Sequence, residues 1–369
     1  MKCSPATGST PRRLLSRLAF LLALALPVAS CDIAHGKDGD VEQLSEGLVF
    51  ERLQVADQAG DVKLVGDLDG DGLLDLVLGG RPDEPLSWWR WPDLHRTTVA
   101  SANVEFTTDG VLADADGDGD LDIVTADGAD GANLLWFENP MPAAEPTDAA
   151  QWQRHVIGTI GSWGKDIKAA DFDGDGSTDI VVRAPDMAMI FFAEPNGGWT
   201  RVQLPPFDMG EEGMAIGDID ADGDTDIVLH GEWARNPGGP AARDAEKWRG
   251  YRVGEFNPAF KALVVDIDRD GRADILTSSS EHTADVTWFS PVDGPTGRWT
   301  GHVILPSVPG AHTLQAADMD RDGDTDVVVG QMHTTDAREL AVFYNVDGRG
   351  TRWARHVIDN VGLHDGVVA

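Results

Sequence analysis

The sequence contains little cysteine, few basic residues and no long hydrophobic segment beyond its start. Two cysteines in 369 residues, Cys3 and Cys31, leave no pair to form a disulfide in the body of the chain, so its stability must come from packing or from another source. Lysine and arginine number 29 against 63 aspartate and glutamate residues. This balance argues against nucleic acid as a partner and against an electrostatic hold on anionic membranes.

The first 30 residues have the layout of a secretory signal. A short apolar run at residues 18–28 follows a basic segment that contains Lys2, Arg12, Arg13 and Arg17. The run is too short to span a bilayer and has the length of a signal's hydrophobic region. It ends in Val28-Ala29-Ser30-Cys31, which resembles the lipobox of bacterial lipoproteins. The alternative is an ordinary signal peptide cut near Ala29, with Cys31 incidental.

The lipobox resemblance implies a processed and anchored protein. We expect a signal peptide at residues 1–30, lipidation of Cys31 as the new N-terminus, and a short linker at residues 31–46. The protein would then lie in the bacterial cell envelope, outside the cytoplasm, and would contact the membrane only through its lipid anchor.

Aspartate is abundant and follows one pattern six times, Asp-x-Asp-x-Asp-Gly-x-x-Asp. The copies start 47, 57, 47, 48 and 52 residues apart. Their carboxylates are Asp67, Asp69, Asp71 and Asp75; Asp114, Asp116, Asp118 and Asp122; Asp171, Asp173, Asp175 and Asp179; Asp218, Asp220, Asp222 and Asp226; Asp266, Asp268, Asp270 and Asp274; and Asp318, Asp320, Asp322 and Asp326.

The spacing of these carboxylates suits a hard cation. Ca²⁺ takes about 6–8 oxygen ligands, and Asp at positions 1, 3 and 5 of a tight loop can converge on one point. Gly at position 6 permits a sharp turn, and Asp at position 9 would close the cage. Mg²⁺ prefers to keep its waters, and Zn²⁺ prefers Cys or His. We therefore predict about six Ca²⁺ sites.

The segments around each copy read as β-strands. Short apolar stretches rich in β-branched residues stand before and after each acidic loop, for example at residues 62–65 and 76–78, where an EF-hand would have helices. An aromatic strand follows, and the last strand of a unit often opens with tryptophan, as at residues 152–157 and 353–358. Four strands in about 50 residues, repeated, predict a β-propeller whose aromatic residues pack between blades.

The units resemble FG-GAP/VCBS repeats, the calcium-binding propeller blades of integrin α-subunits and of many bacterial secreted proteins. The resemblance covers residues 47–369, and the bacterial branch matches better than integrin. It implies an all-β propeller. The pattern predicts seven four-stranded blades: six complete blades with acidic loops, and an incomplete seventh assembled from residues 50–55 and 362–369. On this view the chain is truncated at its C-terminus. The alternative is a six-bladed ring with two leftover strands.

Strand order places the connections before the first strand and after the second strand at the propeller face opposite the acidic loops. These connections include Asp166, Arg183, Glu211, Glu212, Glu281 and Gln331, and the residues there that break the repeat are candidates for ligand binding. His155, His302 and His356 share one strand position and are expected to be structural. The ligand-binding candidates are Arg81, Lys165, His230, Glu232, Lys261, His282, His312, His333 and His364.

Three functions fit these features. The first is a binding or adhesion module for a glycan or for an envelope or extracellular protein. The second is a carbohydrate-active enzyme, similar to propeller lyases and dehydratases, with Lys165, Lys261, His312 and Arg81 as candidates for the chemistry. The third is a structural envelope scaffold. No nucleophile or phosphate-loop motif is present, so we assign no catalytic residue and favour binding. His230, Glu232, His312 and His333 could also hold a transition metal.

Overall fold

The computed structural model describes residues 42–43, 50, 53, 55–56, 60–79, 84–101, 106–128, 133–332, 335–336 and 338–360. The signal peptide and Cys31, as predicted from the sequence, lie outside these residues, as does the linker at 31–46 except for residues 42–43. Within the described ranges no helix has the length and apolar character needed to cross a membrane.

The strands form six sheets, called blades 1 to 6 in chain order. Blade 1 contains β2 (Val62–Gly66), β3 (Asp75–Gly79), β4 (Leu86–Arg90) and β5 (His95–Ala100); blade 2 contains β6 (Phe106–Ala113), β7 (Asp122–Asp127), β8 (Asn133–Glu138) and β9 (Gln153–Thr159); blade 3 contains β10 (Asp166–Ala170), β11 (Asp179–Ala184), β12 (Met187–Ala193) and β13 (Trp199–Gln203).

The second half of the ring repeats this plan. Blade 4 contains β14 (Ala215–Gly217), β15 (Asp226–Leu229), β16 (Glu232–Arg235) and β17 (Arg249–Arg252), with the short 3₁₀ helices η1 (Gly239–Arg243) and η2 (Ala245–Lys247) before β17; blade 5 contains β18 (Phe260–Val265), β19 (Asp274–Ser279), β20 (Thr283–Pro291) and β21 (Trp299–Pro309); blade 6 contains β22 (Thr313–Ala317), β23 (Asp326–Gly330), β24 (Leu340–Asn345) and β25 (Trp353–Asp359).

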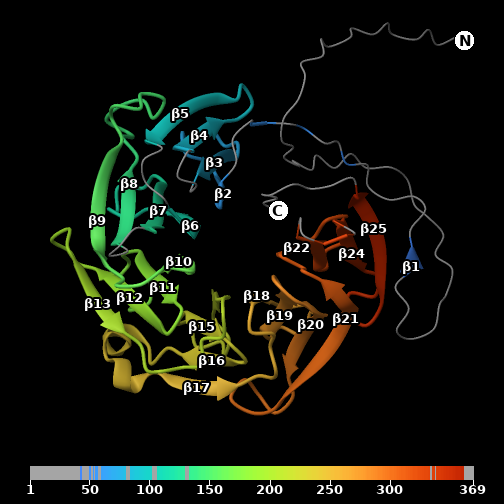
Figure 1. The fold of residues 1–369 in the computed structure, drawn as a ribbon. Coiled ribbons are helices and arrows are strands. Elements are labelled where there is room, and N and C mark those ends of the chain that lie inside the picture. The colour runs from blue at the N-terminus through green and yellow to red at the C-terminus, as the bar shows by residue number, and fades with distance from the viewer. Residues whose placement is uncertain are drawn as a thin grey trace, which may run out of the picture.

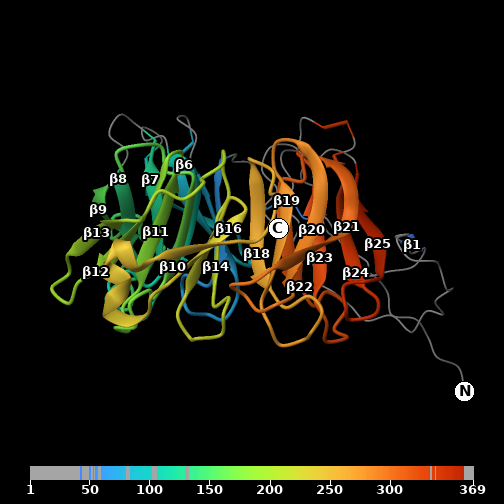
Figure 2. The same ribbon diagram turned by 90° about the horizontal axis from the view of Figure 1, so that it is seen from below.

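The blades are arranged radially. Each blade is a meander in which consecutive strands pair antiparallel. The first strand of each blade lies toward the centre of the ring and the fourth lies at its outer edge (Figure 1). Figure 2 shows the ring edge-on. The predicted β-propeller is therefore confirmed as an all-β ring of four-stranded blades.

The prediction of seven blades is wrong, because the described strands make six. Each of the six acidic motifs has its own complete sheet. Phe50 packs on the face of blade 6 that is turned away from blade 5. Leu53, Val55 and Ala56 pack on blade 1 beside Trp89. Phe50, Leu53 and Val55, predicted to belong to a strand of the seventh blade, therefore cover faces of the first and last blades. Residues 361–369 lie outside the described part of the chain.

A two-residue strand also pairs with the last blade. β1 (Glu42–Gln43) runs parallel to β25, with Glu42 opposite Ala354. It turns the sixth sheet into a five-stranded one and covers part of an outer edge that would otherwise offer unpaired backbone groups.

The core consists of clusters between neighbouring blades, as the aromatic pattern predicts. Trp88 lies between blades 1 and 2, Trp233 between blades 4 and 5, and Trp288 between blades 5 and 6. Their side chains are 0–2% exposed. Because the second and third strands bury both faces, they read as nearly continuous apolar runs, in contrast to the alternating pattern of a half-exposed sheet.

The last Asp of each motif is part of this core. Asp75, Asp122, Asp179, Asp226, Asp274 and Asp326 are at most 1% exposed. In blade 2, Asp122 accepts hydrogen bonds from Ala115 N (2.9 Å) and Asn139 N (2.8 Å). The first bond closes the loop, and the second ties it to the end of the third strand. In blade 5 Pro291 takes the place of Asn139 and has no N–H to donate, so the Oδ1 atom of Asp274 has no hydrogen-bond partner among the described residues.

Every second blade carries an asparagine that reaches back to the preceding blade. Asn139, Asn236 and Asn345 are 1% exposed. Their Nδ2 atoms donate to Leu68 O (2.8 Å), Phe172 O (2.8 Å) and Ile267 O (2.9 Å), respectively. The corresponding residues in blades 1, 3 and 5 are Trp91, Ala193 and Pro291. The ring is therefore built from three blade pairs.

Replacing Asn236 with alanine is expected to destabilise the fold by about 1–3 kcal/mol. The change leaves Phe172 O and Thr225 O buried without their side-chain donor, and a buried unsatisfied polar group costs about this much. Denaturant titration of Asn236→Ala would measure it. Asn196→Ala, in an exposed turn of blade 3, is the matched control and should change the free energy of unfolding by no more than about 0.5 kcal/mol. Equal stability of the two variants would contradict the role of Asn236.

Candidate functional site

The first candidate site is the set of six acidic loops, each joining the first and second strands of a blade. In every loop the N–H of the position-6 glycine donates to Oδ2 of the position-1 aspartate, at 2.8–3.1 Å. These glycines have positive φ, from 84° at Gly271 to 100° at Gly119, which side chains other than glycine rarely adopt. The sequence therefore fixes the loop shape through backbone geometry, before any cation is considered.

The carboxylates of these loops converge. Oxygens of Asp67, Asp69 and Asp71 lie within 4.8 Å of one another, and in blades 2, 3 and 4 the same holds for positions 1, 3 and 9. Position 9 thus offers lone pairs to a cation while its oxygens also accept backbone hydrogen bonds. The sequence predicted position 9 as a ligand and did not foresee that it also ties the hairpin together.

Blades 2, 4 and 6 add a fifth carboxylate at position 7, namely Asp120, Asp224 and Asp324. Both carboxylate oxygens of Asp120 are buried without a hydrogen-bond partner in the described residues, as is Oδ1 of Asp324. Burial, with neighbouring carboxylates adding to it, raises the pKa of Asp120 to about 7. Burial also raises the pKa of Asp122 to about 8. Buried oxygens without hydrogen bonds are the environment that a hard divalent cation relieves, so the donor set fits Ca²⁺.

Arginine side chains contact three of the loops, and in blade 5 Arg272 Nε donates to Asp270 Oδ2 at 2.8 Å. The guanidinium of Arg243, on η1, donates to Asp173 and to Glu194. The guanidinium of Arg235 lies 2.6 Å from Asp220 Oδ2 and 2.9 Å from Asp222 Oδ2. The loops of blades 3, 4 and 5 thus have a positive partner of the protein's own, whereas the Asp120 oxygens of blade 2 have none that the structure describes.

The second candidate site lies at the opposite ends of the inner strands. In blade 3, Asp166 pairs with Arg183 at one end of the hairpin and Ala170 pairs with Asp179 at the acidic loop. Residues just before a first strand or just after a second strand therefore lie away from the acidic loops. The channel-face cluster is defined here as Lys165, Glu212, Lys261, Glu281 and His312 of blades 3 to 6. Lys261 lies at the start of β18, and the other four occupy such positions.

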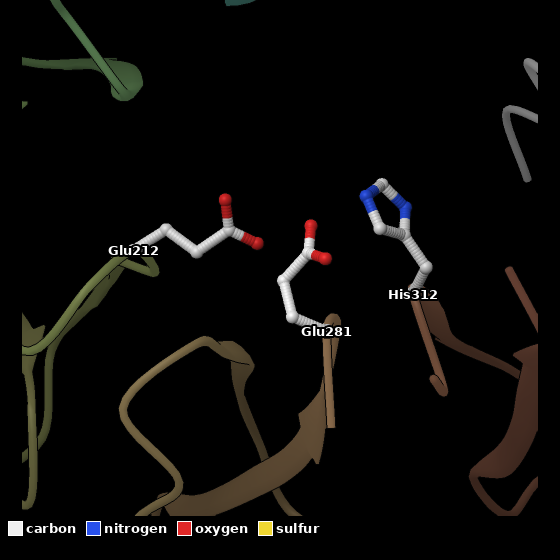
Figure 3. A group of neighbouring side chains, drawn as sticks. All are labelled: Glu212, Glu281 and His312. Atoms are coloured by element: carbon white, nitrogen blue, oxygen red, sulfur yellow. The ribbon is translucent and has the colours of Figure 1, made fainter. Parts of the chain in front are cut away.

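Glu212 is the centre of the channel-face cluster. Its Oε2 atom lies 3.8 Å from Lys165 Nζ and its Oε1 atom lies 3.6 Å from Lys261 Nζ, and it accepts a hydrogen bond from Ser280 Oγ. Burial opposes ionisation of Glu212, but Lys261, Ser280 and Lys165 together hold its pKa below the usual value. Glu212, Glu281 and His312 point toward one another (Figure 3), with ligand atoms within 4.8 Å.

A fully buried arginine holds the loop that carries Glu212. Arg183 is 0% exposed. Its guanidinium donates to Glu211 O at 2.8 Å, to Gly210 O at 3.0 Å and to Met209 O. Asp166, 4.0 Å from the Arg183 Nε atom, accepts a hydrogen bond from Gly213 N at 3.0 Å. Blade 3 thereby fixes the segment that leads into blade 4.

The ligand-binding candidates from the sequence fall in two groups, one at the channel-face cluster and one around Asp208. Lys165, Lys261 and His312 meet at the channel-face cluster, and His282 lies next to it with Nε2 3.5 Å from Glu211 Oε2. His230 contacts Asp208 Oδ2 (3.1 Å) and Phe256 O (3.0 Å). Glu232 accepts from Asp208 N at 2.9 Å. His230 and Glu232 thus both contact Asp208, whereas His312 belongs to the channel-face cluster. Arg81, His333 and His364 lie outside the described residues.

Two of the strand-four histidines pack on buried tryptophans of their own blades. The ring of His155 stacks on Trp136 at 4.3 Å between centroids, and that of His302 stacks on Trp288 at 4.1 Å. The sequence analysis did not identify Ser280, whose hydroxyl donates to Glu212. It also did not identify the ion pair of Lys168 Nζ with Asp109 Oδ2 at 2.9 Å, which lies beside Asp166. The signal for Lys168 and Asp109 was available, because a charged residue on an innermost strand interrupts an apolar pattern.

Comparison with solved structures supports the fold. A lectin of Agrocybe aegerita, whose structure concerns recognition of non-reducing terminal N-acetylglucosamine, is 16% identical, with a TM-score of 0.60 over 85% of this chain and 86% of that one. A protein from Lactobacillus plantarum is 14% identical, with a TM-score of 0.52 over 87% of this chain and 90% of that one. At these identities the likeness shows the fold alone. No curated protein matches the sequence.

The model of the FG-GAP-like repeat matches four segments, at residues 67–125, 114–182, 171–229 and 266–329. Each match runs from one acidic motif to the second strand of the following blade. Together the matches cover more than half of the chain, and they include all six motifs. The chain therefore belongs to the FG-GAP-like repeat family.

Proposed function

We propose that this protein is a calcium-stabilised propeller that serves as a binding module for a glycan, outside the cytoplasm. The main support for binding is the channel-face cluster, where charged side chains from four blades meet at positions that do not repeat from blade to blade. Residues that break a repeat while a rigid scaffold holds them are where a binding site is expected. Carboxylates that accept and ammonium groups that donate suit the hydroxyls of a sugar.

The calcium part of the proposal rests on the acidic loops. Convergent carboxylates and the buried Asp120 oxygens without hydrogen bonds favour a hard cation. When bound, Ca²⁺ would supply positive charge that cancels the repulsion between the carboxylates. The Asp residues of each motif would hold it, and the loops would then brace the rim of each blade.

The glycan part is supported by the fold likeness to the Agrocybe aegerita lectin, whose structure concerns N-acetylglucosamine recognition. The likeness carries no residue correspondence, so the site proposed here rests on this chain's own side chains. The lyase or dehydratase alternative has no specific observation in its favour. The lipid anchor at Cys31 and the envelope location stay predictions of the sequence.

Changing Lys165 to methionine is expected to weaken glycan binding roughly 10–100-fold, because a hydrogen bond to a charged group contributes about 1.5–3 kcal/mol. A glycan array in calcium identifies the ligand, and titration of the best hit measures the variant. Lys247→Met, on the exposed η2 helix, is the control and should bind like the unchanged protein. Binding that Lys165→Met leaves intact would move the site elsewhere. If the calcium-loaded protein binds no glycan, the binding role is rejected and the scaffold role is favoured.

A further inference from the structure

Three side chains from three different blades meet at one point of the channel-face cluster. Glu212 precedes β14 of blade 4, Glu281 follows β19 of blade 5, and His312 precedes β22 of blade 6. Figure 3 shows both carboxylates and the imidazole directed at the same space. One ligand atom from each lies within 4.8 Å of the others. Residues about 70 and 100 positions apart in the chain are thus brought together by the propeller and by no local motif.

Hydrogen bonds hold both the backbone and the side chain of Glu212 in place. Glu212 N donates to Pro258 O at 3.2 Å, and Phe260 N donates to Glu212 O at 3.2 Å, so the backbone of Glu212 is fixed to blade 5. Ser280 Oγ donates to Glu212 Oε1, and Ser280 N donates to Ala259 O at 2.9 Å. A hydrogen bond of this kind, which orients a carboxylate from behind, is typical of metal sites.

The local charge leaves room for a cation. Glu212 and Glu281 stand beside His312, and Glu211 lies 3.5 Å from the neighbouring His282, against the two lysines Lys165 and Lys261. The lysine nitrogens lie 3.8 and 3.6 Å from Glu212. Neither separation is a hydrogen bond, so these contacts leave lone pairs of Glu212 available. The lysines lower the affinity for a cation at this point.

We propose that Glu212, Glu281 and His312 bind one divalent transition-metal ion of the zinc class, in a site separate from the six acidic loops. One imidazole nitrogen with two carboxylate oxygens is a donor set that such ions accept, whereas Ca²⁺ prefers six or more oxygens. Bond lengths of about 2.0–2.2 Å need a small inward movement of Glu281, whose side chain is exposed. The site stands on its own and does not depend on the glycan proposal.

The test uses the full, tag-free chain with its acidic loops saturated by excess calcium. Native mass spectrometry with added Zn²⁺ is expected to show one tightly bound zinc ion per chain, and bound Co²⁺ should give visible absorption bands. In His312→Gln and in Glu281→Gln we expect zinc binding to weaken by more than the roughly 10–100-fold that loss of an outer-shell partner costs. Ser280→Ala, which removes such a partner, should fall within that range. His95→Gln, on the exposed start of β5, should bind zinc normally.

Several outcomes would overturn the proposal: no zinc bound in the presence of calcium, zinc displaced by an equal concentration of calcium, or zinc retained in both His312→Gln and Glu281→Gln. Loss of zinc in His282→Gln with His312→Gln unaffected would assign the metal to the neighbouring histidine and also reject this site. Melting curves of the variants in calcium check that each one folds, and Glu281, being exposed, offers the variant with the least risk to the fold.

Discussion

Excess EGTA is expected to lower the melting temperature of this protein by about 15–25 °C. A ligand at 100 times its dissociation constant adds about 2.7 kcal/mol per site to the folded state, and the chain has six acidic loops. Even part of that sum equals the whole stability of many domains, about 5–15 kcal/mol. A thermal melt by circular dichroism, with and without chelator, measures the shift.

The control is the return of the original melting curve when excess Ca²⁺ is added back, with Mg²⁺ restoring much less. Hydrogen exchange should further separate the blades. Arg243 and Arg235 contact the loop carboxylates of blades 3 and 4, so those loops should keep more protection in EGTA than the loop around Asp120. An unchanged melting curve in EGTA would reject calcium as the stabilising ion.

The strands and the loops could be predicted because both have local causes. Alternation of acidic turns with β-branched runs such as residues 180–182 specifies a hairpin wherever it occurs, and its sixfold repetition specifies a ring. The blade number could not be predicted in the same way. The stretch from Phe50 to Val55 reads like a fourth strand, with Leu53 and Val55 two residues apart, but its apolar residues serve equally for a segment that covers the faces of blades 1 and 6.

The candidate sites divide along the same line. Each acidic loop lies within nine consecutive residues, so its carboxylates can be identified from the motif alone. The channel-face cluster depends on how Glu212, Glu281 and His312 meet across three blades, and nothing local relates them. The pairing of blades by Asn139, Asn236 and Asn345 was readable, because the asparagine recurs in every second repeat. A search for features that recur in every blade does not detect this asparagine.

Replacing Arg183 with methionine is expected to destabilise the folded protein by about 3–5 kcal/mol, the cost of removing one partner from a buried ion pair. The change removes the donors to Met209 O, Gly210 O and Glu211 O, and it leaves the carboxylate of Asp166 without the guanidinium beside it. Denaturant titration in saturating calcium gives the free energy of unfolding. Arg201→Met, on an exposed position of β13, should change it by no more than about 0.5 kcal/mol.

A double variant tests whether the loss comes from the buried pair or from packing. Asp166→Asn alone should also destabilise, because it removes the carboxylate with the largest electrostatic effect on Arg183. The double variant Arg183→Met with Asp166→Asn should be more stable than the sum of the single losses by about 1–3 kcal/mol. Hydrogen exchange at Glu211 and Glu212, whose N–H groups donate to Pro258 O, should rise in Arg183→Met and not in Arg201→Met. Strictly additive losses with unchanged exchange would mean that Arg183 only fills space and does not hold the segment that positions Glu212.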